Sequence, residues 1–390
     1  MGFKMKKIFF VFIILLLFIS FQVSSQTWSG LTRLTWNSGW STQPSIAADT
    51  GGRIHVVWGD NTPGIYICEI YYKRSTDGGS SWSGITRLTW SKTISTETSI
   101  AADTKNGIHA VWRCGKSGNY EIYYKRSTDG GSSWSGITRL TWNSGWSASP
   151  SIAADIGSGI HVVWHDFTPG NADIYYKRSL DSGATWSGVT RLTWNTGNSF
   201  RPCIAVDTSG GIHVVWQDDT PGNNEIFYRR STDSGTEWSA LTRLSWNTGS
   251  SNSPAITTDT SKGIHVVWED GTVGDGDIFY TRSTNSGATW SKRLTRLTWN
   301  AGNFLYPSVA SDSGSGIHLV WADDRMGNSE IFYKHSTDSG GNWSGVTRLT
   351  WNTGDSWRGR LIAENPGGGL HVVWEDNTPG NYEIFYKNHK

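Results

Sequence analysis

The stretch that most constrains this chain is residues 75–82, STDGGSSW, because close copies of it recur at a fixed interval. Five further copies begin at Ser127, Ser179, Ser231, Ser283 and Ser336. Successive copies therefore start 52 or 53 residues apart. A period of this length that continues along the whole chain indicates an array of similar structural units rather than several unrelated domains.

Each unit contains four short runs in which apolar and polar or small residues alternate. In the first unit they are residues 44–49, 54–58, 69–75 and 82–90. Such runs, bounded by Gly, Pro, Asn or Asp, are typical of β-strands, and the recurring stretch between the third and fourth runs is expected to be a hairpin turn. Four antiparallel strands per unit make one blade of a β-propeller.

The two ends of the chain are complementary. The run ending in HVVW or a close variant occurs seven times, but the last unit lacks a fourth strand, whereas residues 27–36 form a fourth strand with no unit before it. We expect residues 27–35 to pair with residues 382–387 and close the ring, which removes exposed strand edges. The predicted fold is all-β, a seven-bladed propeller of four-stranded antiparallel blades that spans residues 26–390 as a single domain.

The pattern SxDxGxxW of the recurring turn resembles the Asp-box, or BNR repeat, of the sialidase-like β-propellers. In that family the box lies between the third and fourth strands, on the face away from the ligand site, so the resemblance implies a scaffold role. Asn285 replaces the Asp in the fifth copy, which a turn tolerates. Sialidases of this family usually have six blades, so the expected seven depart from their pattern.

Residues 1–25 have the composition of a signal peptide, with three lysines before an apolar run at residues 8–19. We expect cleavage after Ser25 and a secreted protein, in the extracellular space, the periplasm or at the cell surface. Without those three lysines, the 34 basic residues fall to 31 against 33 acidic ones. A nearly neutral chain disfavours nucleic acid as a partner. We also expect a monomer with no membrane insertion, cofactor or metal.

The histidines and cysteines of the chain do not indicate a catalytic site. One histidine occupies the same strand position in every unit: His55, His109, His161, His213, His265, His318 and His371. Catalysis or metal binding requires convergence at one point, so these histidines are expected to be structural. Three cysteines occupy unrelated positions, and the sequence leaves open whether Cys68 and Cys114 pair.

Aromatic residues outside the repeat consensus are the best candidates for ligand binding. Of the 24 tryptophans, all but three hold a repeated strand position, and these three fall in the expected interblade loops with further aromatic residues. Aromatic faces beside polar groups suit stacking on a sugar ring, although they equally suit packing against a neighbouring loop. The candidate residues are Trp40, Trp146, Phe200, Arg201, Phe304, Tyr306, Trp357 and Arg358.

These features favour a secreted binding module that recognises an extracellular glycan or glycoprotein through interblade loops on its top face. The alternatives are a sialidase-like glycoside hydrolase, specifically an exo-α-sialidase, and a protein-interaction scaffold. The resemblance implies that such an enzyme needs three arginines, a Tyr with a Glu partner and an Asp. Arginines outside the consensus are available, with Tyr306 as the tyrosine: Arg113, Arg201, Arg325, Arg358 and Arg360. Because the units are nearly uniform, we assign no catalytic residue.

Overall fold

The computed structural model describes most of the chain after its first 26 residues. The described ranges are residues 27–64, 67–91, 93–116, 119–168, 170–272, 276–299, 302, 304–363 and 369–389. The expected signal peptide, residues 1–25, lies outside them. In the part of the chain that the structure describes, no helix is long and apolar enough to cross a membrane.

All elements of the described chain are β-strands, and they fall into four sets. The first strands of the units are β2 (Ser41–Ala48), β6 (Ile94–Ala102), β10 (Ser147–Ala154), β14 (Ser199–Val206), β18 (Ser251–Thr258), β22 (Phe304–Ser311) and β26 (Ser356–Ala363). The second strands are β3 (Ile54–Gly64), β7 (Ile108–Lys116), β11 (Ile160–Asp166), β15 (Ile212–Asp218), β19 (Ile264–Asp270), β23 (Ile317–Asp323) and β27 (Leu370–Asp376).

The third and fourth sets complete the units. The third strands are β4 (Ile67–Ser75), β8 (Asn119–Ser127), β12 (Asp173–Ser179), β16 (Glu225–Ser231), β20 (Asp277–Ser283), β24 (Glu330–Ser336) and β28 (Glu383–His389). The fourth strands are β1 (Thr32–Arg33), β5 (Thr86–Arg87), β9 (Thr138–Arg139), β13 (Thr190–Arg191), β17 (Thr242–Arg243), β21 (Thr295–Arg296) and β25 (Thr347–Arg348). They contain only two residues each.

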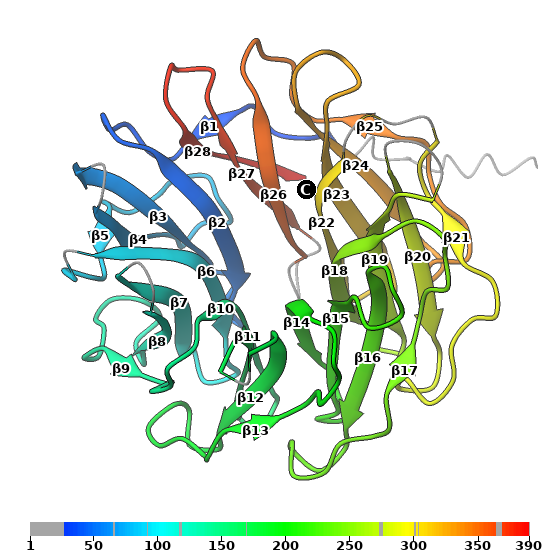
Figure 1. The fold of residues 1–390 in the computed structure, drawn as a ribbon. Helices are drawn as coiled ribbons and strands as arrows, with labels where there is room; N and C mark the ends of the chain where they lie inside the picture. Colours follow the sequence, from blue (N-terminus) through cyan, green and yellow to red (C-terminus); the bar gives the residue numbers. More distant parts are fainter. Residues whose placement is uncertain are drawn as a thin grey trace, which may run out of the picture.

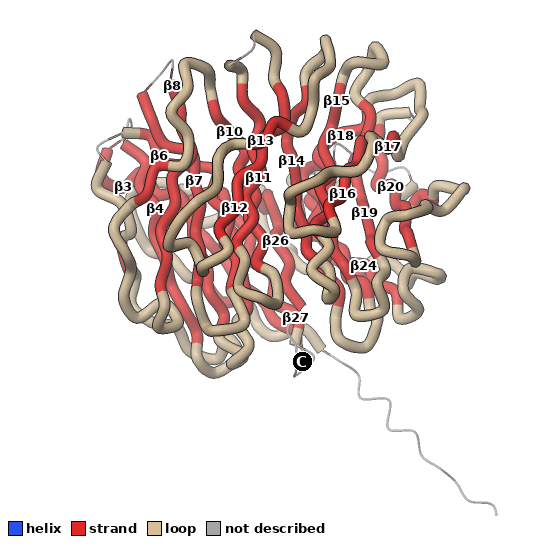
Figure 2. The backbone as a smooth tube through the Cα atoms, turned by 90° about the horizontal axis from the view of Figure 1, so that it is seen from below, coloured by secondary structure: helices blue, strands red, loops and turns tan. Residues whose placement is uncertain are grey.

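The sheets are arranged around a central axis (Figure 1), as in a β-propeller. Five sheets have four strands, in the order first, second, third, fourth. One larger sheet of eight strands contains two such four-strand sets, joined by a single parallel pairing between Cys68 and Ile94. Seen from the side, the strands fill the middle of the molecule and loops cover its two faces (Figure 2).

The hydrophobic core lies between neighbouring four-strand units. One cluster joins Val57 and Tyr72 of the first unit to Ile108 and Trp112 of the next, all with at most 1% of their surface exposed. The same arrangement recurs at the other boundaries, with one tryptophan of each second strand at its centre. A flat indole fills the space between two twisted sheets with little conformational entropy to lose.

The Asp-box turns connect each unit to the preceding one. In the second box, Ser127 Oγ accepts a hydrogen bond from the Gly131 amide at 2.8 Å. Gly131 has a φ of +81°, and a Cβ at this position would overlap the Tyr72 hydroxyl of the preceding unit. The Trp134 ring then packs edge-on against Tyr72 at 5.0 Å between centroids. The box therefore packs around a tyrosine of the preceding unit, and its role is structural.

The recurring histidines belong to the same arrangement. His55 Nδ1 lies 2.8 Å from the Tyr72 hydroxyl, and its Nε2 lies 3.2 Å from the Asp49 carboxylate. The histidine–tyrosine contact recurs in the other units at 2.5–2.9 Å. Every histidine thus has a tyrosine partner, and six of the seven also contact an aspartate that caps a turn within the described residues.

The N-terminal strand completes the sheet of the last unit, at the pairing that the sequence predicts. Strand β1 pairs antiparallel with β28, with Thr32 opposite Tyr386 and Arg33 opposite Phe385. Leu34 is fully buried in a cluster that spans the last and first units. The first strand of the last unit, β26, also contacts β2.

The first strands begin earlier than their sequence suggests. We predicted that the first one spans residues 44–49, whereas β2 begins at Ser41 and ends at Ala48. The same holds in the other units, so residues assigned to interblade loops lie inside strands: Phe200, Arg201, Phe304, Tyr306, Trp357 and Arg358. This corrects the predicted loop location of those candidates. The reason is a bulge with non-strand composition, described next.

Candidate functional site

Each first strand contains a β-bulge near its start, and the bulge carries a non-glycine residue with positive φ. In β2 the register shifts between Thr42 and Ser45, and Gln43 has a φ of +54°. The equivalent residues have φ values of +49° to +59°: Glu97, Ser149, Arg201, Ser253, Tyr306 and Arg358. A bulge bends its strand and redirects a side chain. A backbone conformation disfavoured for these residue types therefore recurs at one place in every unit.

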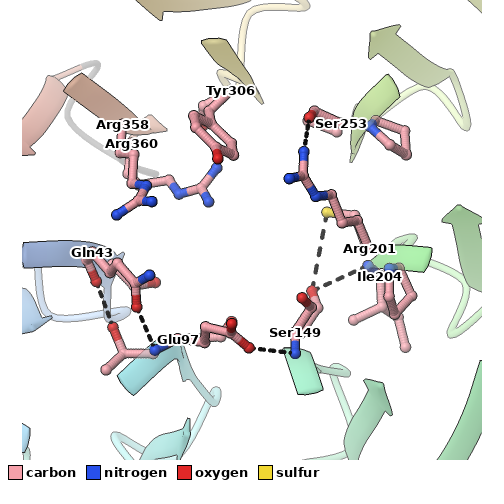
Figure 3. Close-up of a pocket in the computed structure, with 18 of the residues that line it drawn as sticks. Gln43, Glu97, Ser149, Arg201, Ile204, Ser253, Tyr306, Arg358 and Arg360 are labelled. Atoms are coloured by element: carbon pink, nitrogen blue, oxygen red, sulfur yellow. Dashed lines mark hydrogen bonds between the residues drawn. The ribbon is translucent and has the colours of Figure 1, made fainter. Parts of the chain in front are cut away.

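The bulge residues meet around the axis of the molecule. A cavity of about 540 Å³ is lined by all seven bulge residues and by the strand residues that follow them. Their side chains come from separate strands and surround an open centre (Figure 3). The position that follows the bulge residue is proline in five of the seven units, whereas the bulge position itself carries Gln, Glu, Ser, Arg, Ser, Tyr and Arg in turn. The repeat thus provides seven equivalent backbone positions around one cavity, and they carry side chains of five different kinds.

Positive charge predominates in this cavity. Three guanidinium groups line it, those of Arg201, Arg358 and Arg360, against the single carboxylate of Glu97. Tyr306 stands between two of them, with the guanidinium carbons of Arg201 and Arg358 at 5.3 and 5.2 Å from its ring centroid. Figure 3 shows Tyr306 beside Arg358 and Arg360 on one side of the opening. Convergent guanidinium groups with a phenol among them suit a carboxylate-bearing ligand.

The cavity side chains differ in how firmly they are held. Arg201 Nη1 donates to Ser253 Oγ at 2.6 Å, and Arg358 Nη1 lies 3.3 Å from Glu375 Oε1. Glu375 also accepts from the Gln43 amide at 2.6 Å. Within the described residues, Arg360 makes no hydrogen bond or ion pair. Arg360 is therefore the guanidinium most available to a ligand.

Burial and neighbouring charges shift the ionisation of these groups. Burial lowers the pKa of Arg358, but the Glu375 carboxylate and the Tyr306 hydroxyl more than offset it, so the pKa is raised. Burial lowers the pKa of Arg360. Burial raises the pKa of Glu375, and it raises the pKa of Glu269 to about 7 although Arg201 opposes the shift. A bound anion would restore favourable solvation to Arg360 in place of water.

Several candidates lie outside the cavity. Trp40 and Trp146 are exposed and pack edge-on against hairpin residues Tyr382 and Tyr120 at 5.9 and 5.4 Å. Phe200 contacts His165 and Phe167 of the preceding unit. Trp357 is half-buried opposite Glu375, and the side chain of Phe304 lies outside the described residues. Of the eight candidates, the structure brings Arg201, Tyr306 and Arg358 together.

Two of the other arginines considered for an enzyme, Arg113 and Arg325, do not line the cavity. Arg113 forms an ion pair with Glu97 at 3.0 Å and lies over the Tyr120 ring. Arg325 pairs with Asp323 at 2.8 Å on a hairpin and does not line the cavity. Arg360 lines the cavity together with Arg201 and Arg358. The sequence gives one sign that Arg360 differs from the scaffold. Four other units carry serine at its position: Ser45, Ser99, Ser151 and Ser308.

Four residues that line the cavity are not among the residues predicted from the sequence, namely Gln43, Glu97, Ser149 and Ser253. The sequence signal for them is a variable position that lies directly before a proline in five of the seven units. Aromatic content drew attention to the correct segment but not to the correct side chains.

The cysteines and the potential metal-binding side chains of the described residues do not form a further candidate site. All three cysteines are free thiols, and burial raises the pKa of Cys68 to about 12. Cys203 lines the central cavity. In the described ranges, no group of three or more His, Cys, Asp or Glu side chains is placed to hold a metal ion.

Comparison with known proteins identifies the fold. No family model matches the sequence, and no curated protein sequence matches it. Among solved structures, a protein of unknown function from Dyadobacter fermentans DSM 18053 is 12% identical, with 93% of this chain and 99% of that chain covered and a TM-score of 0.59. An ulvan lyase, a polysaccharide lyase, is 11% identical over 91% and 95%, with a TM-score of 0.65.

A Hadza microbial sialidase is 12% identical, with 89% of this chain covered and a TM-score of 0.56; this chain spans 65% of its length. At such low identities, these similarities show the fold alone. The chain has the β-propeller fold of the sialidase-like proteins, as the Asp-box resemblance implies.

Proposed function

We propose that this protein binds a carboxylate-bearing glycan in the central cavity and that it acts as a secreted binding module. The observation that carries the proposal is the convergence of Arg201, Arg358 and Arg360 around Tyr306, with Arg360 left without a protein partner among the described residues. Guanidinium groups recognise carboxylates by paired hydrogen bonds, and a phenol ring offers a face for the sugar. Two proteins of this fold are named for action on carbohydrates, a sialidase and an ulvan lyase.

The architecture proposed with this function is a ring of seven blades closed by the N-terminal strand. Its support is the pairing of β1 with β28, the two four-strand sets within the eight-stranded sheet, and the contact of β26 with β2. In such a ring the bulges lie near the ends of the first strands that follow the interblade loops. Trp40 and Trp146 are thus proposed contacts for outer sugar residues of the same glycan. The signal segment supports export, and the protein is proposed to act as a monomer.

A second candidate function is glycoside hydrolysis of the sialidase type. The observation in its favour is Glu269, a half-buried carboxyl near Arg201 whose raised pKa of about 7 suits proton transfer at neutral pH. A carboxyl with a raised pKa near an arginine also occurs without catalysis, so binding is the preferred function.

The test is a glycan array read beside a fluorogenic sialoside assay, with Arg360→Ser as the variant. Serine already occupies this position in four other units, so the fold should tolerate it. Arg293→Ser, at an exposed site, is the matched control for loss of one positive charge. We expect acidic glycans to bind the natural protein and the control, and to bind Arg360→Ser at least ten-fold more weakly.

The other outcomes separate the alternatives. Release of the fluorophore, lost in a Glu269→Gln variant, would establish the hydrolase. Binding of neither acidic nor neutral glycans, together with no turnover, would contradict both proposals and favour a protein-interaction scaffold.

A further inference from the structure

A second feature of the molecule, far from the cavity, is a set of exposed tryptophans that follow the fourth strands. Their exposed fractions lie between 58% and 67%: Trp36, Trp90, Trp142, Trp194, Trp246, Trp299 and Trp351. One exposed apolar side chain is ordinary on a protein surface. Exposure of the largest apolar side chain at the same position in every unit requires a cause, because a scaffold position would be filled by a buried residue or a polar one.

Packing explains the other two tryptophan sets but not this one. The tryptophans of the second strands are at most 1% exposed and form the core between sheets. Those that follow the Asp-boxes pack on a tyrosine of the neighbouring unit, as Trp82 does on Tyr386 at 4.9 Å. By contrast, Trp36 makes no ring contact with another aromatic residue within the described chain, and about two thirds of its surface is open to solvent. These seven residues are here called the rim tryptophans.

Cationic side chains orient each rim tryptophan. The Lys73 ammonium and the Arg33 guanidinium lie 5.3 and 5.8 Å from the Trp36 ring centroid. Both cations have other partners, because Lys73 donates to the Leu34 carbonyl at 3.0 Å and Arg33 pairs with Glu383 at 2.9 Å. Arginine or lysine side chains lie over the other six rings in the same way. The indole is thereby held in place beside polar donors, which limits the entropy lost on binding.

The rim tryptophans are distributed around the outside of the molecule. The first strands line the central cavity, and the fourth strand is the far end of each four-strand order, so the residues that follow it lie at the periphery (Figure 1). Each unit therefore presents one indole at its outer edge. Isolated indoles on separate units do not form the contiguous apolar patch of a protein interface. They match a partner that is itself repetitive.

We propose that the rim tryptophans form a multivalent surface for a polysaccharide, with each indole stacking on the face of one pyranose ring. An indole face with cationic donors beside it complements the C–H face and hydroxyl groups of a sugar. Single contacts of this kind are weak, and repetition around the rim multiplies their effect through high local concentration. This surface is separate from the arginine-lined cavity, and neither site requires the other.

The test is affinity electrophoresis in native gels that contain neutral polysaccharides (dextran, mannan or xyloglucan) or an acidic one (polygalacturonate). The rim variant carries Trp142→Ala, Trp246→Ala and Trp351→Ala on three separate units, and the matched control carries Ile156→Ala and Leu180→Ala at equally exposed apolar sites. We expect at least one polysaccharide to retard the natural protein and the control, and the rim variant to bind it about ten-fold more weakly. The Arg360→Ser variant should be retarded as strongly as the natural protein. Failure of the cavity proposal can therefore be distinguished from failure of the rim proposal.

A second measurement avoids any loss of folding in the variant. Acrylamide quenches the fluorescence of exposed tryptophans, and the polysaccharide that retards the natural protein should reduce that quenching. The proposal is overturned if no polysaccharide in the panel retards the natural protein, if the folded rim variant is retarded as strongly as the control, or if the polysaccharide leaves quenching unchanged.

Discussion

At the residue scale, the molecule separates residues that build the fold from residues that give it a function. The Asp-box, the histidine and the second-strand tryptophan recur because every unit needs the same contacts. The bulge position is free of that requirement, because its side chain leaves the sheet and enters the cavity. Arg360 illustrates the consequence: one arginine in place of a recurring serine adds a positive charge that no described residue pairs.

The Arg360→Ser variant is predicted to be more stable than the natural protein as well as a poorer binder. Removal of a guanidinium from water is unfavourable without a partner, and its replacement by the serine of other units removes that cost. We expect the free energy of unfolding to rise by about 1 kcal/mol, measured by denaturant unfolding in the absence of ligand. A less stable Arg360→Ser variant would show that Arg360 has a structural role.

The Trp134→Ala variant is predicted to destabilise the fold without affecting the cavity. Trp134 packs on Tyr72 across the boundary between two units, and its removal leaves part of that interface empty. A loss of about 2 to 4 kcal/mol is expected from the size of the deleted ring and its partial burial. Thermal melting gives the stability, and titration of the remaining folded protein should give an unchanged affinity.

At the scale of strands and sheets, the sequence was informative where the alternation of residues follows the pleat. The strand runs, the hairpin turns and the pairing of residues 27–35 with the last unit could all be predicted from periodicity and from the complementary ends. The starts of the first strands could not, because the bulge contains proline, serine and glycine, which are typical of loops. The candidates Arg201, Tyr306 and Arg358 were found, although in a strand rather than a loop. Their convergence depends on distances between units, which no local pattern contains.

Deletion of residues 27–36 tests the role of the N-terminal strand. The deletion removes buried Leu34 and leaves β28 with an unpaired edge. We expect a loss of about 3 kcal/mol or more and a tendency to associate through the exposed edge. Melting and size-exclusion chromatography measure both. An unchanged melting temperature would contradict the proposed closure of the ring.

Acid is predicted to weaken the same junction. The His335 ring stacks on His318 at 6.3 Å and on Tyr333 at 5.5 Å, near Trp28 of the N-terminal segment. Burial lowers the pKa of both histidines, so the unfolded chain binds protons more readily than the folded one. Their contribution to stability is complete above the unfolded pKa of about 6.5 and is lost as the pH falls towards the lowered folded values. The His335→Gln variant should show a smaller slope of unfolding free energy against pH below about 6.5. An unaltered slope would show that His335 does not contribute to the loss of stability in acid.

At the scale of the whole molecule, the arrangement of similar sheets around a central axis brings the bulge residues to a common centre and places the rim tryptophans at the periphery. The centre carries different side chains and suits one specific ligand group, whereas the rim carries identical ones and suits a repetitive chain. Both proposals follow from this geometry, since neither set of residues is contiguous in sequence.

The central claim is that the cavity arginines bind a carboxylate. The most direct measurement is calorimetric titration of the natural protein and Arg360→Ser with an acidic oligosaccharide found on the array and with its carboxyl-reduced form. The account predicts that the Arg360→Ser substitution alone, or reduction of the sugar carboxylate alone, weakens binding at least ten-fold. The two changes combined should weaken binding little more than either does alone, because both remove the same interaction. Equal binding of the acidic and reduced sugars, or fully additive losses, would contradict it.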